Sequence, residues 1–412
     1  MTQTNIELIP LRPVISCEVA TTLDLIIRIT PETETLTVER PPLNLGLVID
    51  RSGSMSGEKL EYARQAACYA VSQLLPIDRV SLVSYDDQVK TLVPNTLVEN
   101  KDTILRKIRT LTPGGTTALH QGWVEGSTEV SQHLNPEALN RVLLLSDGLA
   151  NVGETNPDII ASDVHGLAQH GISTSTLGIG DDYNEDLMEA MANSGDGNYY
   201  YIEHPQQLET IFQNELKGLV ATIGQKVTLS LTPQTNVVLE EVFNDLETNN
   251  NGEYLLPNLV VGNPINIAVR LKVPAMTTSE SLCEMTLSWN DSQQSQRQEK
   301  TVTLTLPVVS QSELEDYPFN SEVRQLVTTL QTARAKEEAI RYVDQGNYKL
   351  AQSSLQEAED MIESSSICYS PLEAEEELSE LRDLSANLEQ KETKKFRKKA
   401  TFQKYQRRQS KK

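Results

Sequence analysis

Residues 43–55 read LNLGLVIDRSGSM. The first eight residues form a nearly continuous apolar run, which is typical of a β-strand covered on both faces. The run stops at Asp50, and two serines, Ser52 and Ser54, follow at alternate positions. Three small oxygen-bearing side chains directly after a buried strand suit a turn, a phosphate cradle, a nucleophile or a metal site. The rest of the chain distinguishes these four interpretations.

Strand and helix patterns alternate throughout residues 43–220. After residues 43–50, further strands are predicted at 79–86, 141–146, 171–180 and 198–202, with a hairpin strand at 88–94. Amphipathic helices are predicted at 57–75, 100–111, 119–132, 157–169, 184–193 and 205–220. This alternation predicts an α/β fold with a doubly wound, mostly parallel, Rossmann-like sheet and helices on both faces.

The segments on either side have a different pattern. Apolar residues recur at every second position in residues 23–29, 227–231, 265–273, 283–289 and 302–306. A period of two without intervening helices predicts half-buried antiparallel strands. We expect residues 1–40 and 225–308 to share one β-sandwich, with residues 43–220 inserted between its strands. The alternative is two separate small β-units, although one or two N-terminal strands are unstable alone.

Residues 312–390 have a polar, helical pattern. Two helical stretches meet at Gly346-Asn347, which resembles a single tetratricopeptide-like hairpin, and Pro371 opens a further helix. Residues 391–412 follow as a basic tail with eleven Lys or Arg and one Glu. We expect this tail to be solvated, and it is the one segment suited to contact an anionic partner.

The overall charge limits the class of partner. The chain has a formal net charge of −22, of which the tail contributes +10, so the first 390 residues carry −32. A uniformly acidic body argues against general nucleic-acid binding. The N-terminus lacks the apolar core of a signal peptide, and no window approaches the ~20 apolar residues of a membrane span. These features predict a cytoplasmic protein.

Two of the four interpretations of the opening stretch, the phosphate cradle and the nucleophile, fit poorly. A P-loop needs GxxxxGK[ST] and a dinucleotide fold needs GxGxxG, and neither pattern follows the first strand. Ser52 does not lie in a GxSxG elbow. Among the five histidines, His120 alone lies near a candidate functional loop. Hydrolase chemistry is therefore disfavoured, and we expect no enzymatic activity.

A hard cation fits the oxygen-rich stretch better. Mg²⁺ prefers oxygen ligands in an octahedron, and ligand sites in open α/β sheets lie at the carboxyl ends of the strands. Two other segments should reach the same edge. The loop TPGGTT (112–117) presents Thr116 or Thr117, and the strand 141–146 ends in a serine followed by Asp147. Taken singly, each motif also suits a helix cap or a turn.

The combination of DRSGSM, GGTT and LLLSDG resembles the von Willebrand factor A domain and its metal-ion-dependent adhesion site. The resemblance implies a site made of Asp50, Ser52, Ser54, Thr116 and Asp147. It further implies that the serines and the threonine ligate Mg²⁺ or Mn²⁺, while the aspartates often act through water. The first threonine after the two glycines matches the family position. The arrangement of flanking strands and helical tail is similar to bacterial von Willebrand A proteins and, distantly, to inter-alpha-trypsin inhibitor heavy chains.

The resemblance implies a non-catalytic interaction module that captures a Glu or Asp of a partner protein as a ligand of the cation. The alternative is a subunit that couples a separate AAA-type ATPase to its target, as in the magnesium-chelatase-like family, since this chain has no Walker motif. Two other acidic pairs are expected to have structural roles only. Asp86-Asp87 is expected to be solvated in a hairpin turn, and Asp181-Asp182 is expected to cap the next helix.

Overall fold

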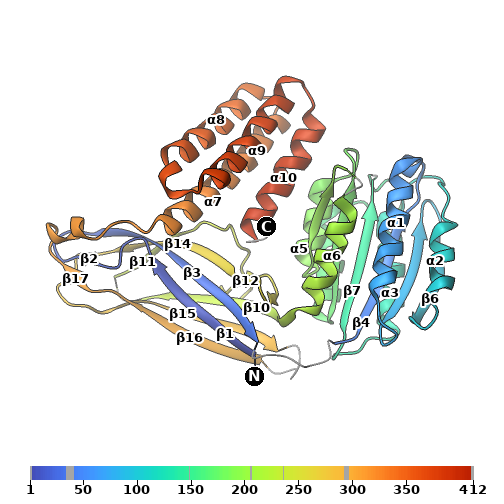
Figure 1. The fold of residues 1–412 in the computed structure, drawn as a ribbon, viewed down its shortest axis with the longest axis horizontal. Coiled ribbons are helices and arrows are strands. Elements are labelled where there is room, and N and C mark those ends of the chain that lie inside the picture. Colours follow the sequence, from blue (N-terminus) through green and yellow to red (C-terminus); the bar gives the residue numbers. More distant parts are fainter. Residues whose placement is uncertain are drawn as a thin grey trace. The chain divides into compact units, whose positions relative to one another are not determined.

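The structure is a computed structural model that describes residues 2–33, 41–147, 149–204, 207–234, 236–291 and 297–409. The chain folds into two compact units, residues 37–221 and residues 1–36 with 222–412 (Figure 1). Gly148 of the predicted Asp-Gly turn and residues 410–412 of the predicted tail lie outside the described residues. Within those described ranges, no helix is both long enough and apolar enough to cross a membrane.

Residues 37–221 contain a six-stranded sheet with the strand order β6-β5-β4-β7-β8-β9. The strands are β4 (Leu43–Asp50), β5 (Arg79–Tyr85), β6 (Val89–Leu97), β7 (Leu139–Ser146), β8 (Ile172–Ile179) and β9 (Tyr199–Ile202). Neighbouring strands are parallel, apart from the antiparallel pair β5 and β6. Because β4 has β5 on one side and β7 on the other, the winding direction reverses beside β4. The carboxyl end of β4 is therefore a topological switch point.

Helices pack on both faces of this sheet (Figure 1). They are α1 (Glu58–Gln73), α2 (Lys101–Arg109), α3 (Leu119–Ser131), α4 (Pro157–Gln169), α5 (Glu185–Ser194) and α6 (Gln207–Val220). Residues of α1, α2 and α6 share an apolar cluster with alternate residues of β4 such as Leu45 and Leu47. Helix α3 packs closely on the other face, where a Cβ at Gly126 would lie 2.2 Å from Val48. Asn184, and not Asp181 or Asp182 as expected, caps α5.

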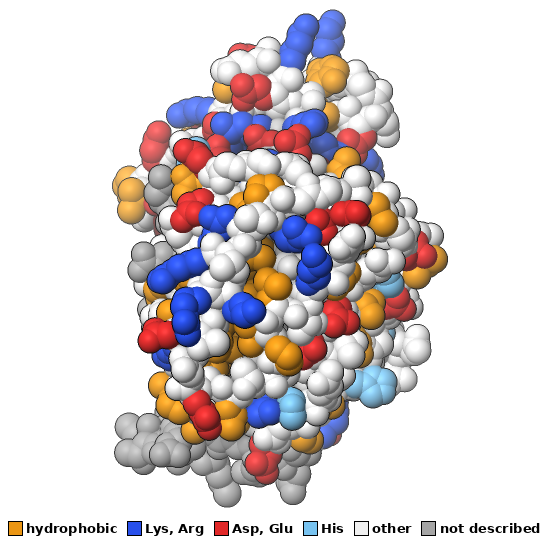
Figure 2. Space-filling model, turned by 90° about the vertical axis from the view of Figure 1, so that its right-hand side faces the viewer, with side chains coloured by type: hydrophobic (Ala, Val, Ile, Leu, Met, Phe, Trp, Pro, Cys, Tyr) orange, Lys and Arg blue, Asp and Glu red, His pale blue; other side chains and the backbone are white. Residues whose placement is uncertain are grey.

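Helix α2 carries a basic surface on this otherwise acidic unit. Four of its nine residues, Lys101, Arg106, Lys107 and Arg109, are basic, and Asp102 is its one acidic residue. Figure 2 views the side of the molecule that bears α2 and β6 and shows Lys and Arg side chains gathered around apolar ones. Lys101 contacts the far end of α1, where its Nζ donates to the carbonyl oxygen of Ser72 at 2.6 Å. The contact of Lys101 therefore lies away from the start of α1.

A buried ion pair joins the interior strand β7 to helix α6. Arg141 on β7 and Glu215 on α6 are both almost fully buried, with Nη1 and Oε1 2.5 Å apart. Burial acts to raise the pKa of Glu215, but the charge of Arg141 and hydrogen bonds from Ser175, Tyr200 and Asn198 outweigh it. The pKa of Glu215 is therefore below its ordinary value.

This pair predicts acid sensitivity of the α/β unit. A carboxyl group with a lowered pKa in the folded state stabilises the fold above its unfolded pKa, and this contribution is lost as the pH falls through the folded pKa. Glu215→Gln should reduce the loss of stability at acid pH. It should also lower the free energy of unfolding near neutral pH by about 3–5 kcal/mol, because Arg141 would stay buried without a counter-charge. Urea unfolding followed by Trp123 fluorescence in a Trp289→Phe background measures both effects. Glu137→Gln, at an exposed position, is the control. An equal loss of unfolding free energy at acid pH in both variants would contradict the prediction.

Two antiparallel sheets form the β-part of the other unit (Figure 1). The first has the order β1-β3-β14-β11, with β1 (Thr2–Pro10), β3 (Thr21–Thr33), β14 (Ile265–Val273) and β11 (Val238–Val242). The second has the order β12-β10-β15-β16, with β12 (Tyr254–Leu256), β10 (Thr222–Pro233), β15 (Ser281–Asp291), β16 (Arg297–Thr305), and β13 (Leu259–Val260) paired to β10. A short parallel pair joins β2 (Ile15–Ser16) to β17 (Val308–Val309).

The β3–β14 pairing brings together segments from either side of the α/β unit. Their register runs from Thr21 opposite Val273 to Ile29 opposite Ile265. A single apolar cluster contains inward residues of both sheets, including Ile27 of the first sheet and Leu287 of the second. The two sheets therefore enclose one core, and the chain leaves and re-enters it on either side of residues 37–221.

Among the described residues, four helices complete this unit: α7 (Ser321–Asp344), α8 (Tyr348–Ser364), α9 (Pro371–Glu389) and α10 (Thr393–Arg408). The short 3-10 segments η2 (Glu313–Asp316) and η3 (Ser366–Cys368) precede α7 and α9. Gly346 adopts a φ of +73° at the predicted turn between α7 and α8, a conformation that favours glycine. Ser370, directly before Pro371, forms a reciprocal capping box with Glu373 at the start of α9.

The expected solvated tail is instead a packed helix. Phe396, Ala400 and Tyr405 of α10 are buried in the helical bundle. Its cations pair with carboxylates of neighbouring helices, as where Arg407 lies 2.8 Å from Glu377 and Lys399 lies 2.8 Å from Asp383. The expectation was wrong for the described part of the tail because the acidic faces of α7 and α9 neutralise its charge.

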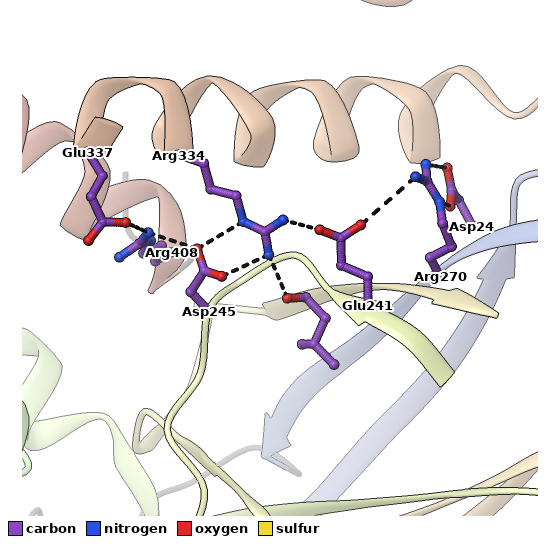
Figure 3. Close-up of polar contacts among 8 residues, drawn as sticks. Asp24, Glu241, Asp245, Arg270, Arg334, Glu337 and Arg408 are labelled. Atoms are coloured by element: carbon purple, nitrogen blue, oxygen red, sulfur yellow. Dashed lines mark hydrogen bonds and ion pairs between the residues drawn. The ribbon is translucent and has the colours of Figure 1, made fainter. Parts of the chain in front are cut away.

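Arginines join the bundle to the first sheet (Figure 3). Arg334 on α7 binds Glu241 and, at 2.8 Å, Asp245. Asp245 also accepts from Arg408 at the end of α10, at 2.7 Å, and Arg408 pairs with Glu337 of α7. An apolar contact that includes Phe243 lies beside these pairs. The network fixes both the first and the last helix of the bundle to the loop after β11.

Candidate metal site

Four predicted site residues lie at the carboxyl edge of the α/β sheet. Asp50 is the last residue of β4, and Asp147 directly follows β7. Because β4 and β7 are adjacent and parallel, with Ile49 opposite Leu145, the two strand ends meet at the switch point. The chain after β4 turns through the 3-10 segment η1 (Gly53–Met55), which carries Ser54, before α1 begins. The topology therefore brings two distant aspartates to one place.

Asp50 is fully buried and holds two other parts of the site. One carboxylate oxygen accepts from the Ser52 backbone N–H at 2.8 Å, and the other accepts from the Ser146 hydroxyl at 2.6 Å. Burial raises the pKa of Asp50 to about 6, against the effect of these hydrogen bonds, and the charge of Asp147 adds to the rise. Asp50 is thus a desolvated carboxylate whose charged form a nearby cation would stabilise.

Hydrogen bonds connect the remaining hydroxyls to Asp147. The Oγ atoms of Ser52 and Ser54 are 3.0 Å apart, and Ser54 donates to Asp147 Oδ1 at 2.8 Å. The other oxygen of Asp147 lies 2.6 Å from the Nζ of Lys59. Asp147 is buried, whereas Ser54 is exposed. Asp50, Ser52, Ser54 and Asp147 therefore form one connected oxygen cluster with an open side at Ser54.

The structure places the predicted Thr116 on a loop that is tied to the same cluster. The Gly53 N–H donates to the carbonyl oxygen of Gly115 at 2.8 Å, and the Gly114 N–H donates to that of Arg51 at 2.6 Å. Thr116 is exposed directly after this contact. Thr117 is instead buried, and its N–H donates to the side chain of Asn151 at 2.9 Å. The exposure of the two threonines favours Thr116 over Thr117 as the residue open to a ligand.

Sequence reasoning missed Asp86, which positions this loop. Asp86 is buried and not solvated as expected, and its Oδ2 accepts from Arg51 at 2.7 Å and from the Gly115 N–H at 3.1 Å. Burial acts to raise the pKa of Asp86, but backbone hydrogen bonds from Gln88 and Gly115 and the charge of Arg51 hold the pKa below its usual value. A Cβ at Gly114 would lie 1.8 Å from Asp86 Oδ2, so the loop needs glycine there. Asp86 directly follows β5 at the same sheet edge, and this position in the sequence could have indicated that it belongs to the site.

Removing the Asp86 carboxylate should weaken the site without removing any predicted ligand. Asp86→Ala is expected to lower cation affinity about tenfold, as is common when a group that orients ligands is lost. Calorimetric titration with Mg²⁺ measures this change. Asp87→Ala is the matched control because Asp87 is the exposed neighbour. Equal affinities in the two variants would show that Asp86 does not position the loop.

The donor set suits a hard cation. Within the described ranges, no group of three or more His, Cys, Asp or Glu side chains is arranged to hold a metal ion. A cation at the cluster would therefore depend on hydroxyl oxygens and water in addition to Asp50 and Asp147. Such all-oxygen sites suit Mg²⁺ or Mn²⁺ and lack the nitrogen and sulfur ligands that Zn²⁺ and Cu²⁺ prefer.

Comparison with known proteins finds relatives of the α/β unit. Residues 44–214 match the family model of the von Willebrand factor type A domain. The chain is 31% identical over 202 residues to the uncharacterized protein sll0103 of Synechocystis, covering 48% of this chain and 47% of that protein. It is 28% identical to human inter-alpha-trypsin inhibitor heavy chain H3 over 47% of this chain and 24% of that protein. The chain thus spans about half or less of the length of these relatives.

Two solved structures have a similar fold over nearly the whole chain. A von Willebrand factor type A protein from Catenulispora acidiphila aligns with a TM-score of 0.72 and 15% identity, covering 93% of this chain and 90% of that one. The ArnB paralog VWA2 from Sulfolobus acidocaldarius aligns with a TM-score of 0.61 and 20% identity, covering 98% and 97%. At these identities the likeness concerns the fold alone.

Proposed function

We propose that the chain is a non-catalytic protein-interaction module, on the premise that residues 44–214 match the family model of the von Willebrand factor type A domain. In this proposal Asp50, Ser52, Ser54, Thr116 and Asp147 hold Mg²⁺ or Mn²⁺, and the cation binds an acidic side chain of a partner. The observation that supports it is the hydrogen-bonded oxygen cluster at the switch point between β4 and β7.

The site residues have two kinds of role in this proposal. Ser52, Ser54 and Thr116 present neutral hydroxyls to the cation. Asp50 holds the Ser52 backbone, Asp147 orients the Ser54 hydroxyl, and both aspartates orient bound waters. The cation supplies a Lewis-acidic position that accepts a carboxylate oxygen. Neutral hydroxyl ligands neutralise little of its charge, so the site stays attractive to a carboxylate from outside.

Affinity capture tests the partner half of the proposal. Immobilised wild-type chain is incubated with cell extract in Mg²⁺ or in EDTA, with Asp50→Ala as the matched bait. We expect a protein that is retained only by the wild type and only with Mg²⁺, and that is released by free glutamate as a competing carboxylate. Identical retention in Mg²⁺ and EDTA would contradict the proposal. An AAA-type ATPase in the Mg²⁺-specific fraction would favour the complex-subunit alternative.

A further inference from the structure

Lys59 contacts the buried end of the candidate metal site. It lies in the first turn of α1, directly after the loop that carries Ser52 and Ser54. Its Nζ is 2.6 Å from Asp147 Oδ2 and 3.8 Å from Asp182 Oδ2. The Lys59 side chain is 29% exposed, whereas the side chain of Asp147 is fully buried and that of Asp182 is 57% exposed. The stronger contact is therefore with the site residue and not with the surface carboxylate.

The chain leaves room for this lysine. Gly180 follows β8 and adopts a φ of +71°, and a Cβ built there would lie 3.2 Å from Lys59 Cε. A larger residue would crowd the aliphatic part of Lys59 at the point where it passes toward Asp147. An ammonium group beside a buried carboxylate interacts much more strongly than an exposed surface pair, because less water screens the two charges. This contact therefore contributes to the electrostatics of the site.

Lys59 changes the net charge of the site. Asp50 and Asp147 bring −2, and Lys59 reduces this to −1, while Arg51 and Asp86 form their own ion pair and cancel. With a divalent cation bound, the site carries +1 with Lys59 and would be neutral without it. The ammonium repels the cation, but it also leaves the loaded site with a positive charge that a partner carboxylate can neutralise.

We propose that Lys59 is a charge-balancing residue of the metal site, which weakens cation binding and strengthens binding of a carboxylate to the loaded site. This inference rests on the proposed function, because it concerns the same cation. Both carboxylate oxygens of Asp147 accept hydrogen bonds, one from Ser54 and the other from Lys59. Asp147 therefore serves the cation through its hydrogen-bonded neighbours while Lys59 stays in place.

The test uses Lys59→Met, which keeps an unbranched side chain one atom shorter and removes its charge. Calorimetric titration of the full chain with Mg²⁺ and Mn²⁺ should show affinity that is roughly tenfold higher in the variant. Acetate is then titrated into Mg²⁺-saturated protein and followed by NMR of its methyl group. We expect acetate affinity to fall several-fold in the variant. Lys101→Met, on α2 where it contacts the far end of α1, should match the wild type in both titrations.

The outcomes separate this inference from the proposed function. Failure of the wild type to bind either cation would refute the proposed site itself. Wild-type binding with equal or lower cation affinity in Lys59→Met, or with unchanged acetate affinity, would overturn the role of Lys59 and leave the proposed function intact. Lys59→Arg should retain wild-type behaviour because the charge is kept. Lys59→Gln provides the same charge removal if the Met variant does not fold.

Discussion

Replacing Asp50 with alanine is expected to abolish Mg²⁺ binding while leaving the metal-free fold about as stable as the wild type. The carboxylate is buried, and burial raises its pKa from 3.8 to about 6. At neutral pH its ionised form therefore costs the folded state about 3 kcal/mol. The variant escapes this cost but loses two hydrogen bonds, from Ser52 and Ser146, so we expect a net change within about 1 kcal/mol.

The pH dependence gives this prediction a second signature. A group whose folded pKa is raised contributes stability that is fully present below the unfolded pKa and is lost as the pH rises through the folded pKa. For Asp50 that loss falls between pH 3.8 and about 6 in the metal-free wild type. The Asp50→Ala variant should lack this loss, and its melting temperature should not respond to added Mg²⁺.

The control for Asp50→Ala is Ser56→Ala. Ser56 is exposed and follows the motif at the next alternate position after Ser54. Calorimetry and thermal melts with and without Mg²⁺ should give wild-type behaviour for Ser56→Ala. Mg²⁺ binding that survives in Asp50→Ala would show that the cation binds elsewhere.

Deleting residues 391–412 should produce the largest structural effect on the other unit. The deletion removes the buried Phe396 and Tyr405, and it removes Arg407, the partner of the buried Glu377 on α9. Arg407 lies 2.8 Å from Glu377, and burial raises the pKa of Glu377 while Arg407 opposes that rise. Phe396→Ala alone should cost about 3–5 kcal/mol, and the deletion should cost more.

Circular dichroism distinguishes a packed helix from an appendage. The truncated chain should lose more helical signal than the sixteen residues of α10 account for, because α7–α9 lose their packing partner. Glu389→Ala, at the exposed last residue of α9, is the mild control and should melt like the wild type. A truncated chain with the wild-type melting temperature, and with loss of the α10 signal alone, would contradict the prediction.

The α/β unit was predictable because its signals are local. The apolar run that forms β4 ends at the residue where the sequence places the carboxylate, and α4 begins and ends as its periodicity predicts. Asp50 and Asp147 could be brought together because parallel neighbouring strands end at one sheet edge. Asp86 met the same condition after β5, yet two consecutive aspartates before a hairpin are typical of a solvated turn. Its burial depends on Arg51 and Gly115, which no local pattern connects to it.

The packing of α10 could not be predicted for a related reason. Its sequence is dominated by Lys and Arg, and its buried residues are few. The cations are neutralised by carboxylates far away in the sequence, as where Arg408 reaches Asp245 and Glu337. Similarly, Lys59 contacts Asp147 across 88 positions. Charge pairs between distant segments leave no periodic signal, so composition alone favours a solvated tail.

The position of a bound cation is the most direct test of the proposed site. Crystals of the wild-type chain soaked in Mn²⁺ and measured at the manganese absorption edge locate every ordered ion by anomalous scattering. We predict a strong anomalous peak bounded by the hydroxyls of Ser52, Ser54 and Thr116, with Asp50 and Asp147 beside it. Ordered manganese only at surface carboxylates, with no peak at this cluster, would contradict the assignment of the site.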